Sequence, residues 1–372
     1  MNRRAWIKRS GAAGALSLLG GHAIASTLTA EEKRLFNPRP LGDPIQLSFN
    51  ENPFGPSAKV REAITGAFDL GCRYPSSIMD ELVDMLAKRE GVIKDHIVVG
   101  GGSTEGLKVT GLTFANNGGE IIAARPTFLA MMNYAKQWGA TVNWVDLDKT
   151  LTHDVDEMEK RISSKTKLIF LCNPNNPTST LLPKQKLVDF CTSAARKTIV
   201  FSDEAYYDFI EEKDYPSMVS LVKKGENVIV SRTFSKVYGL AGLRIGYLVA
   251  KPELANQIRQ NVVANTNVLA IKAAMSAMQD DDFYQFSLKK VREGKQLMYS
   301  AMDDLGLEYL PSNTNFIFFK TGRDIKTFNA QMLAEGVRVG RPFPPFNEWC
   351  RISMGTIEEV QLFNKALGRV MG

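Results

Sequence analysis

The lysine at position 236 has the neighbours of a covalent nucleophile. Two hydroxyl residues, Thr233 and Ser235, stand just before it, and Arg244 follows eight places later. A solvated surface lysine is the ordinary interpretation, but residues 231–247 are rich in apolar side chains and glycine and do not form a charged face. Burial in such surroundings lowers the pKa of a lysine, which can then act as a nucleophile and form a Schiff base.

A glycine-rich stretch at residues 100–106 is suited to holding an anion. It contains three consecutive glycines followed by Ser103 and Thr104. Glycines let the backbone approach an anion closely, and a following helix offers free N–H groups and the positive end of its dipole. The stretch lacks the lysine of a nucleotide P-loop and the glycine spacing of a dinucleotide fold. In isolation, it is equally consistent with a simple strand-to-helix turn.

Two further polar segments follow β-branched runs. Residues 172–178 hold two Asn-Pro pairs, and proline restricts the residue before it to extended or turn geometry, which would hold the amide of Asn176 rigidly. Asp203 comes shortly after the run at 198–201. An acid at the end of a buried strand costs desolvation free energy unless it meets a cation, although a helix N-cap is the common alternative.

Seven short β-branched runs, separated by helical periods, would position these segments between about Lys59 and Val249. The runs are Ile97–Val99, Glu120–Ala123, Thr141–Val145, Lys167–Leu171, Thr198–Phe201, Asn227–Val230 and Arg244–Val249. This alternation predicts an α/β fold, a mostly parallel sheet with helices on both faces. Open sheets of this kind bind ligands at the carboxyl ends of their strands, so the polar segments should meet there.

The pattern changes after residue 280. Apolar residues from Leu288 to Leu305 follow the spacing of one long helix, a strand is expected at 314–319, and Thr356 with Glu359 forms a capping box that opens a final helix. We therefore predict a large domain at 56–280 and a smaller α+β domain at 281–372. Residues 26–55, rich in proline and asparagine, are expected to form an extended arm.

Residues 1–25 are predicted to be an export signal. Arg3, Arg4, Lys8 and Arg9 precede an apolar stretch and the small-residue site Ala23–Ala25. The start, Asn-Arg-Arg-Ala-Trp-Ile-Lys, resembles the twin-arginine motif, and the stretch is too short and weakly hydrophobic to anchor the chain in a membrane. The expected location is periplasmic, or cytoplasmic if this segment is an ordinary basic tail.

Composition excludes several classes of partner and site. The chain has 372 residues and a net charge of +6, but without the four cations of the signal, 42 basic residues stand against 40 acidic ones. This balance gives no electrostatic footprint for nucleic acid. The four cysteines and the two histidines that follow the signal, His96 and His153, lack the spacing of a metal site. No metal site is therefore predicted.

Together, these four segments resemble the fold-type I aminotransferases that use pyridoxal phosphate, most closely the histidinol-phosphate aminotransferase branch. The resemblance runs from Leu47–Pro53 to Cys350–Thr356. It implies that Lys236 forms the internal aldimine and then moves the substrate proton, and that Asp203 pairs with the pyridinium nitrogen. It also implies that Asn176 and Tyr206 bind the phenolic oxygen of the cofactor.

The same resemblance assigns the remaining site residues. It implies that Phe128 stacks on the cofactor ring and that Arg351 grips the substrate α-carboxylate, beside Asn176. Tyr74 would reach the phosphate of a neighbouring subunit, which implies a homodimer with shared active sites. The implied phosphate cup consists of Ser103, Thr104, Thr233, Ser235 and Arg244.

Two departures from the family pattern concern a turn and the substrate. Ser179 stands where the family usually has glycine. Residues 340–346 differ from the usual segment before the carboxylate arginine, and Arg341 is a candidate for a distal substrate phosphate, with Arg338 as its competitor. Three nearby aromatic residues also make an aromatic substrate a candidate: Phe343, Phe346 and Trp349.

The predicted function is transfer of an amino group between an amino acid, or a histidinol-phosphate-like amine, and a 2-oxo acid. A decarboxylase or C–S lyase of the same fold would share Lys236 and Asp203, because the bond that breaks is the one perpendicular to the cofactor ring. A catalytically silent pyridoxal-phosphate-fold binding protein is a further alternative. A dinucleotide-dependent dehydrogenase lacks its fingerprint.

Overall fold

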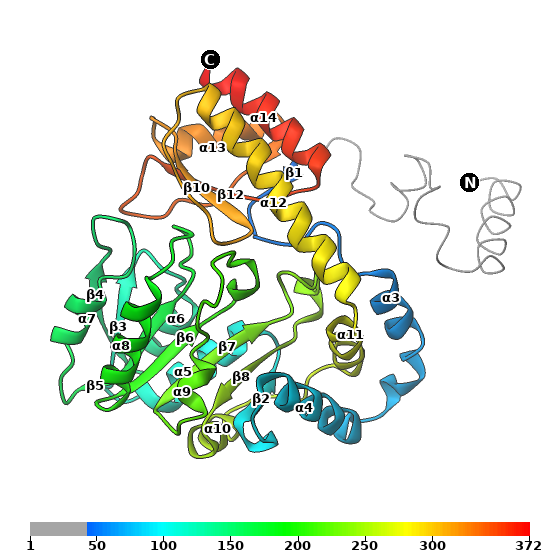
Figure 1. Ribbon diagram of the computed structural model, residues 1–372, viewed down its shortest axis with the longest axis vertical. Helices are drawn as coiled ribbons and strands as arrows, with labels where there is room; N and C mark the ends of the chain where they lie inside the picture. Colours follow the sequence, from blue (N-terminus) through cyan, green and yellow to red (C-terminus); the bar gives the residue numbers. More distant parts are fainter. Residues whose placement is uncertain (1–42) are drawn as a thin grey trace, which may run out of the picture. The chain divides into compact units, whose positions relative to one another are not determined.

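A computed structural model describes residues 43–372 of the chain. The predicted export signal and most of the predicted arm lie outside these described residues. Residues 45–372 form one compact unit that contains both predicted domains (Figure 1).

A seven-stranded mixed sheet forms the centre of the large domain. Its strands follow the order β2-β8-β7-β6-β5-β3-β4, and the five from β7 to β4 are parallel while β8 and β2 run antiparallel to their neighbours. All seven strands predicted from the sequence are present, with ends shifted by one to three residues. Their bounds are Ile97–Gly100 (β2), Glu120–Arg125 (β3), Thr141–Asp146 (β4), Thr166–Cys172 (β5), Ile199–Asp203 (β6), Val228–Thr233 (β7) and Gly246–Ala250 (β8).

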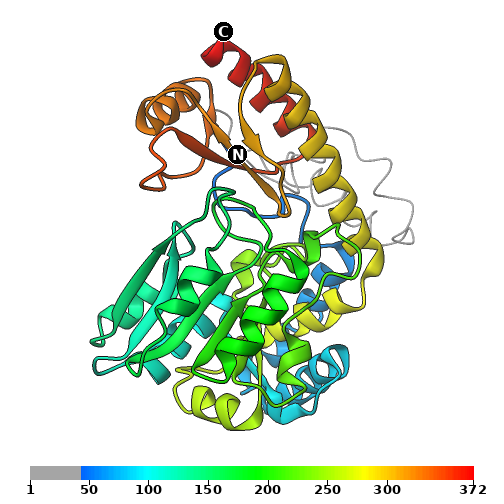
Figure 2. The same cartoon turned by 60° about the vertical axis from the view of Figure 1, so that its left-hand side comes forward.

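Helices cover both faces of this sheet, as Figures 1 and 2 show. Alternate residues of one strand enter different cores: Phe170 of β5 packs with one group of helices, while Ile169 and Leu171 pack with the other. The first group is α5 (Ser103–Ala115), α6 (Ala130–Lys136) and α10 (Pro252–Arg259). The second is α3 (Ala58–Thr65), α4 (Ser76–Glu90), α7 (Val155–Lys160), α8 (Lys184–Ala195), α9 (Val219–Val222) and α11 (Val268–Met278).

The small domain is built on the predicted long helix and strand. Helix α12 spans Asp281–Asp304, and β10 (Phe316–Lys320) is the middle strand of an antiparallel sheet with β9 (Tyr309–Leu310) and β12 (Trp349–Ser353). Helix α13 covers Ile325–Ala334, and the final helix α14 covers Ile357–Met371. Both hydrogen bonds of the predicted capping box between Thr356 and Glu359 are present at the start of α14. The sequence analysis did not anticipate β9, β12 or α13.

The last part of the predicted arm belongs to the small domain. Strand β1 (Ile45–Gln46) pairs in parallel with β11 (Val337–Arg338), and Ser353 N then donates to Leu47 O at 2.9 Å. Residues 45–47 are therefore held by strands that lie almost 300 positions later in the chain. The predicted domain division at residue 281 omits this contribution.

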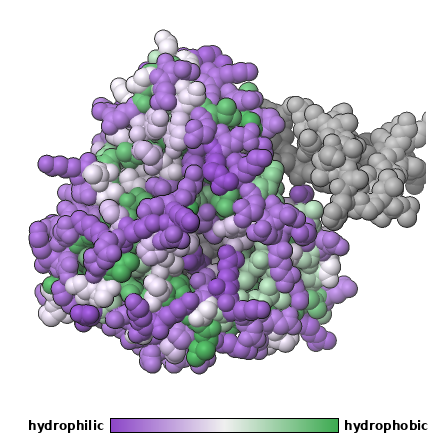
Figure 3. Space-filling model, viewed as in Figure 1, coloured by the Kyte–Doolittle hydropathy of each residue, from purple (hydrophilic) through white to green (hydrophobic). Residues whose placement is uncertain are grey.

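The surface seen in Figure 3 is mostly hydrophilic, with hydrophobic residues in small separate areas. Among the described residues, no helix combines the length and apolar character needed to cross a membrane.

Candidate active site

A cavity of about 650 Å³ lies at the carboxyl ends of β5 and β6 and beside the loop that follows β7, where open α/β sheets bind ligands. Small-domain residues close its other side, and in Figures 1 and 2 that domain lies at one end of the large sheet. Eleven of the residues predicted from the sequence line this cavity: Ser103, Thr104, Phe128, Asn176, Asp203, Tyr206, Ser235, Lys236, Arg244, Arg341 and Arg351.

Lys236 lies in the loop after β7, with its amine at the cavity. The Nζ atom donates to the backbone oxygen of Asn50 at 2.9 Å and to that of Phe49 at 3.3 Å. Burial, together with the nearby Arg351 guanidinium, lowers the pKa of Lys236 to about 8, against the opposing charges of Glu51 and Asp203. Near neutral pH the unprotonated form, which a nucleophile and a base both require, is therefore a minority of this amine but far more abundant than for an exposed lysine.

Asp203 is the last residue of β6 and is 2% exposed. Its Oδ1 atom is buried without a hydrogen-bond partner among the described residues. Burial raises the pKa of Asp203 to about 7. A carboxylate in this position is costly unless a cationic group enters the cavity beside it.

The start of α5 forms one wall with Arg244. No side chain caps this helix, and Ser103 and Thr104 of its first turn line the cavity beside Ser235. Arg244 Nη2 donates to Gly101 O at 3.1 Å. Gly102 has φ +87°, and a Cβ atom there would lie 2.3 Å from Arg244 Nη2, so only glycine permits this approach. Free helix N–H groups, hydroxyls and a guanidinium together make an anion cup.

Asn176, Tyr206 and Arg351 form a connected group across the two domains. Asn176 Nδ2 donates to Tyr206 Oη at 3.3 Å, and Arg351 Nη1 donates to Asn176 Oδ1 at 2.7 Å. Arg351 is held on β12 because Gly340 N donates to its backbone oxygen at 2.9 Å. A Cβ atom at Gly340 would lie 2.4 Å from that same oxygen. Burial lowers the pKa of Arg351 to about 10.

Arg338, Arg341 and Arg351 all line the same cavity. Arg341 and Arg351 lie over the ring of Phe343, at 4.2 and 5.0 Å from its centroid. None of the ion pairs within residues 43–372 involves these three arginines. The cavity therefore has an excess of positive charge on its small-domain side.

Two of the three aromatic residues considered for substrate contact do not line the cavity. Phe343 lines it, whereas Phe346 and Trp349 pack around Phe318 in an aromatic cluster that Phe343 joins from the cavity side. The sequence analysis grouped Phe343, Phe346 and Trp349 because they lie within seven consecutive residues. The pairing of β12 with β10 instead directs Trp349 onto Phe318.

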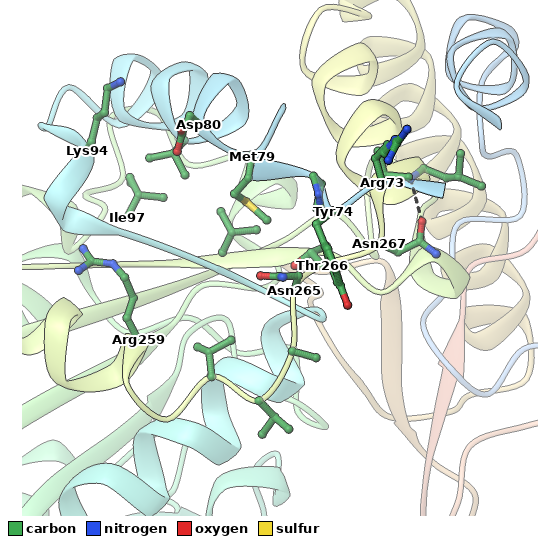
Figure 4. Close-up of a pocket in the computed structure, with 18 of the residues that line it drawn as sticks. Arg73, Tyr74, Met79, Asp80, Lys94, Ile97, Arg259, Asn265, Thr266 and Asn267 are labelled. Carbon is green, nitrogen blue, oxygen red and sulfur yellow. Dashed lines mark hydrogen bonds between the residues drawn. The ribbon is translucent and has the colours of Figure 1, made fainter. Parts of the chain in front are cut away.

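Two residues predicted for the cofactor site do not line this cavity. Thr233 is buried behind it, and its hydroxyl accepts a hydrogen bond from Ser235 N at 3.1 Å. Tyr74 is 87% exposed and lines a second cavity of about 1090 Å³, where it lies beside Thr266 (Figure 4). Thr233 thus supports the loop of the anion cup, and Tyr74 lies outside the site of its own chain.

The sequence analysis missed one part of the wall, residues 48–51. Leu47–Pro53 was recognised only as the start of the family resemblance. The Asn-Glu-Asn-Pro run in this segment is a turn signal, but nothing in it indicates that the turn reaches the carboxyl ends of β5 and β6.

This set of groups fits pyridoxal phosphate. The cavity offers a lysine of lowered pKa, an anion cup for a phosphate, and a buried acid with one unpartnered oxygen for a protonated ring nitrogen. Together with the seven-stranded mixed sheet and the small antiparallel domain, this site defines a fold-type I pyridoxal-phosphate enzyme.

Comparisons with known proteins identify the family. Residues 42–367 match the aminotransferase class I and II family. A histidinol-phosphate aminotransferase of Moorella thermoacetica is 38% identical over 341 residues, covering 90% of this chain and 87% of that protein. The chain belongs to the aminotransferase class I and II family and is a pyridoxal-phosphate-dependent aminotransferase.

Solved structures agree with this assignment. The crystal structure of a putative histidinol-phosphate aminotransferase from Erwinia carotovora atroseptica has a TM-score of 0.85 and 31% identity, over 88% of this chain and 95% of that chain. The histidinol-phosphate aminotransferase of Sinorhizobium meliloti, in complex with pyridoxal-5′-phosphate, has a TM-score of 0.81 and 25% identity, over 96% and 99% of the two chains. Transamination is thus favoured over the decarboxylase, lyase and silent-protein alternatives.

Proposed function

We propose that Lys236 is the residue that bonds the cofactor and moves the substrate proton. The observation that carries this proposal is the pairing, in one cavity, of a lysine amine of lowered pKa with the unpartnered Oδ1 of Asp203. When bound, pyridoxal phosphate withdraws electrons from the substrate Cα and makes its proton acidic. Lys236 Nζ takes that proton and returns it, and Asp203 keeps a cationic ring nitrogen in place.

The other cavity residues position the reacting groups. Ser103, Thr104, Ser235 and Arg244 would hold a phosphate by hydrogen bonds and charge, supported by Thr233. Asn176 and Tyr206 would donate to the phenolic oxygen, and the half-buried Phe128 would stack on the ring. Residues of both domains line the cavity, and shielding from water by the bound substrate would strengthen each electrostatic contact.

The test of this assignment is borohydride reduction of the holoenzyme followed by peptide mapping. We expect the pyridoxyl label on Lys236 alone. Lys236→Ala should abolish transamination and leave a folded protein, because the amine is not part of the hydrophobic core. A label on any other lysine would contradict the assignment.

We propose that the substrates are a phosphorylated amine of the histidinol phosphate type and a 2-oxo acid. The relatives' names point to this amine. Arg338, Arg341 and Arg351, which form no ion pairs among the described residues, give the cavity a positive charge that suits a doubly charged phosphate. Buried Arg351 would bind the α-carboxylate of an amino acid or 2-oxo acid. Arg338 and Arg341, both more exposed, would bind the distal phosphate.

Alanine variants assayed with histidinol phosphate, histidinol and phenylalanine as amino donors separate these roles. Arg351→Ala should lower kcat/KM for phenylalanine and for the 2-oxo acid acceptor. The loss should correspond to roughly 2 to 4 kcal/mol of transition-state stabilisation, the contribution of a bidentate charged contact. Arg341→Ala should depress kcat/KM for histidinol phosphate and spare the two donors without phosphate. Equal losses for all donors in Arg341→Ala would refute the division of labour, and preference of the wild type for phenylalanine would favour an aromatic substrate.

We propose that the enzyme works as a homodimer with shared active sites. Tyr74 and Val263, 87% and 84% exposed, both line the large cavity drawn in Figure 4, and large apolar side chains this exposed typically mark an interface. A second copy of the chain would cover them, and Tyr74 would then reach the phosphate cup of that copy.

We also propose that the enzyme is exported in folded form to the periplasm. The support is the paired arginines, apolar stretch and small-residue site within residues 1–25, which lie outside the described residues. A bound cofactor and a shared site favour a route that carries folded proteins. Fractionation and N-terminal sequencing should yield a periplasmic protein that begins at Ser26, and changing Arg3 and Arg4 to lysine should stop export. A cytoplasmic protein that begins near Met1 would refute the proposal.

A further inference from the structure

Asn50 lines the active-site cavity and is bonded to both domains. It is 1% exposed, and its backbone N–H, backbone oxygen, side-chain oxygen and side-chain N–H₂ all take part in hydrogen bonds. A buried residue whose polar groups are all satisfied has one well-defined orientation. None of the roles described so far involves its side chain.

On the small-domain side, Asn50 is fixed by Ser353 and Asn315. Ser353 Oγ accepts from Asn50 N at 2.8 Å and donates to Asn50 Oδ1, also at 2.8 Å. Asn315 Nδ2 donates to the backbone oxygen of Asn50 at 3.0 Å. Ser353 lies on β12, two residues after Arg351, so Asn50 is tied to the strand that carries this substrate-binding candidate.

On the large-domain side, Asn50 contacts Tyr206 and Lys236. Its Nδ2 donates to Tyr206 Oη at 2.9 Å, and its backbone oxygen accepts from Lys236 Nζ at 2.9 Å. The second acceptor of that amine is the adjacent carbonyl, Phe49 O, at 3.3 Å. Consecutive carbonyls of one short segment therefore hold the lysine amine.

This arrangement fixes the direction of the amine lone pair. A neutral amine has two N–H bonds and one lone pair at roughly tetrahedral angles. With both N–H bonds directed at Phe49 O and Asn50 O, the lone pair must point away from these carbonyls. The amine is then ready to take a proton on the side opposite residues 49 and 50, without first rotating.

The backbone conformation at Asn50 makes the geometry possible. Its φ is +55°, in the left-handed region, where asparagine is tolerated far better than most residues. The side-chain bonds to Tyr206 and Ser353 hold it there, and this directs its carbonyl at Lys236 while the Phe49 carbonyl lies close by.

We propose that Asn50 is a positioning residue for the Lys236 amine: through its bonds to Ser353 and Tyr206, it holds the carbonyls that orient the amine lone pair for proton transfer. This inference rests on the proposed role of Lys236. It adds that the position of the base is set from the small domain, so the strand that carries Arg351 also fixes the group that moves the proton.

The variant that isolates this role is Asn50→Gly, since glycine accepts the positive φ and removes only the side chain. In the full-length apoprotein, acetic anhydride should label Lys236, relative to exposed Lys149, at least about threefold more slowly than in the wild type, because the lone pair is no longer held toward the cavity. In the holoenzyme, kcat should fall with KM nearly unchanged, and the isotope effect of a Cα-deuterated donor should rise.

Two further variants control for stability. Ser353→Ala removes the small-domain bonds to the Asn50 side chain and backbone N–H, leaves the Asn315 bond and Asn50 itself in place, and should shift both measurements in the same direction. Asn364→Ala loses a comparable bond, from Nδ2 to Leu297 O at 2.9 Å in the small domain, and should change neither. The inference would be overturned if Asn50→Gly and Ser353→Ala both kept the wild-type labelling ratio and isotope effect. It would also be overturned if Asn364→Ala changed these two measurements as much as the other variants do. A borohydride label on another lysine would instead refute the proposed function, so the two failures are distinguishable.

Discussion

Burial shifts the pKa values of the acid Asp203 and the base Lys236 toward each other. The pKa of Asp203 rises to about 7 and that of Lys236 falls to about 8, and burial is the largest cause in both cases. Without the cofactor, both groups thus change charge within a narrow range near neutral pH. If pyridoxal phosphate bonds to Lys236 and places its ring nitrogen beside Asp203, as proposed, binding removes the free-energy cost of burying these two charged groups. The holoenzyme should then be more stable than the apoprotein.

Asp203→Asn should change how the stability of the apoprotein depends on pH. An unfolded aspartate titrates near 3.9, whereas the folded pKa is about 7. Between these values the folded state binds the extra proton, so the free energy of unfolding of the wild type falls as pH rises through this range and is constant above it. Asparagine cannot ionise, so the free energy of unfolding of Asp203→Asn relative to the wild type should rise by roughly 3 kcal/mol from pH 4 to pH 7.

Urea unfolding of apoprotein at several pH values measures this difference. Asp304→Asn, which changes an exposed aspartate of α12, is the matched control and should follow the wild-type curve. Parallel curves for wild type and Asp203→Asn would show that Asp203 has an ordinary pKa in the folded apoprotein.

Most site residues could be predicted because each stands in a short polar segment after a β-branched run. Asn176 and Lys236 follow strands β5 and β7, Asp203 is the last residue of β6, and strand ends can be recognised from local composition. Asn50 could not be predicted in this way. Its partners Tyr206 and Ser353 lie 156 and 303 positions away, and only the folded chain brings them together.

At the scale of elements, the loop after β5 contains a strained residue. Ser179 has φ +61° and is fully buried, and its backbone oxygen accepts from Asn313 N at 3.2 Å. The departure from glycine identified in the sequence thus falls where a left-handed backbone is required. A side chain in this conformation costs on the order of 1 kcal/mol or more.

Ser179→Gly should therefore raise the free energy of unfolding by roughly 1 kcal/mol, once the greater flexibility of unfolded glycine is subtracted. Ser179→Ala keeps the strain and removes the hydroxyl that bonds to Thr178 O, so it should be less stable than the wild type. Denaturant unfolding of the three holoenzymes gives the comparison. If Ser179→Gly were less stable than the wild type but more stable than Ser179→Ala, the hydroxyl would outweigh the backbone strain.

The elements themselves could be predicted to different degrees. Strands β2 to β8 lie in β-branched runs that are buried in all but the edge strand β4, and α12 and α14 have long apolar periods, so their sequences indicate them directly. Strands β1, β9 and β11 have two residues each, too short for any periodicity. These three strands form only because a neighbouring segment pairs with them in the folded protein. Local sequence therefore does not predict them.

At the scale of the whole molecule, the proposed dimer predicts complementation between two inactive chains. Chains with Lys236→Ala and chains with Tyr74→Ala should each have little activity, but a heterodimer contains one site with an intact Lys236 and the intact Tyr74 of its partner. Unfolding and refolding an equal mixture should restore about a quarter of wild-type activity, given random pairing of subunits.

Mass measurement of the holoenzyme by light scattering accompanies this assay and should give twice the monomer mass. A dimer without restored activity would show that Tyr74 does not complete the active site of the partner subunit. If the holoenzyme has the mass of a monomer, its active sites cannot be shared between subunits.

The position of β12 after every strand of the large sheet has a consequence for synthesis. Arg351 and Ser353 leave the ribosome long after Lys236 and Asp203. A nascent chain can therefore build the sheet and the anion cup, but not the substrate-binding wall or the anchor of Asn50. Premature termination just before β12 would yield a product that retains Lys236 and Asp203 but lacks Arg351, the proposed carboxylate-binding residue. The order of translation thus leaves the amine of Lys236 without its proposed anchor through Ser353 until β12 has been made.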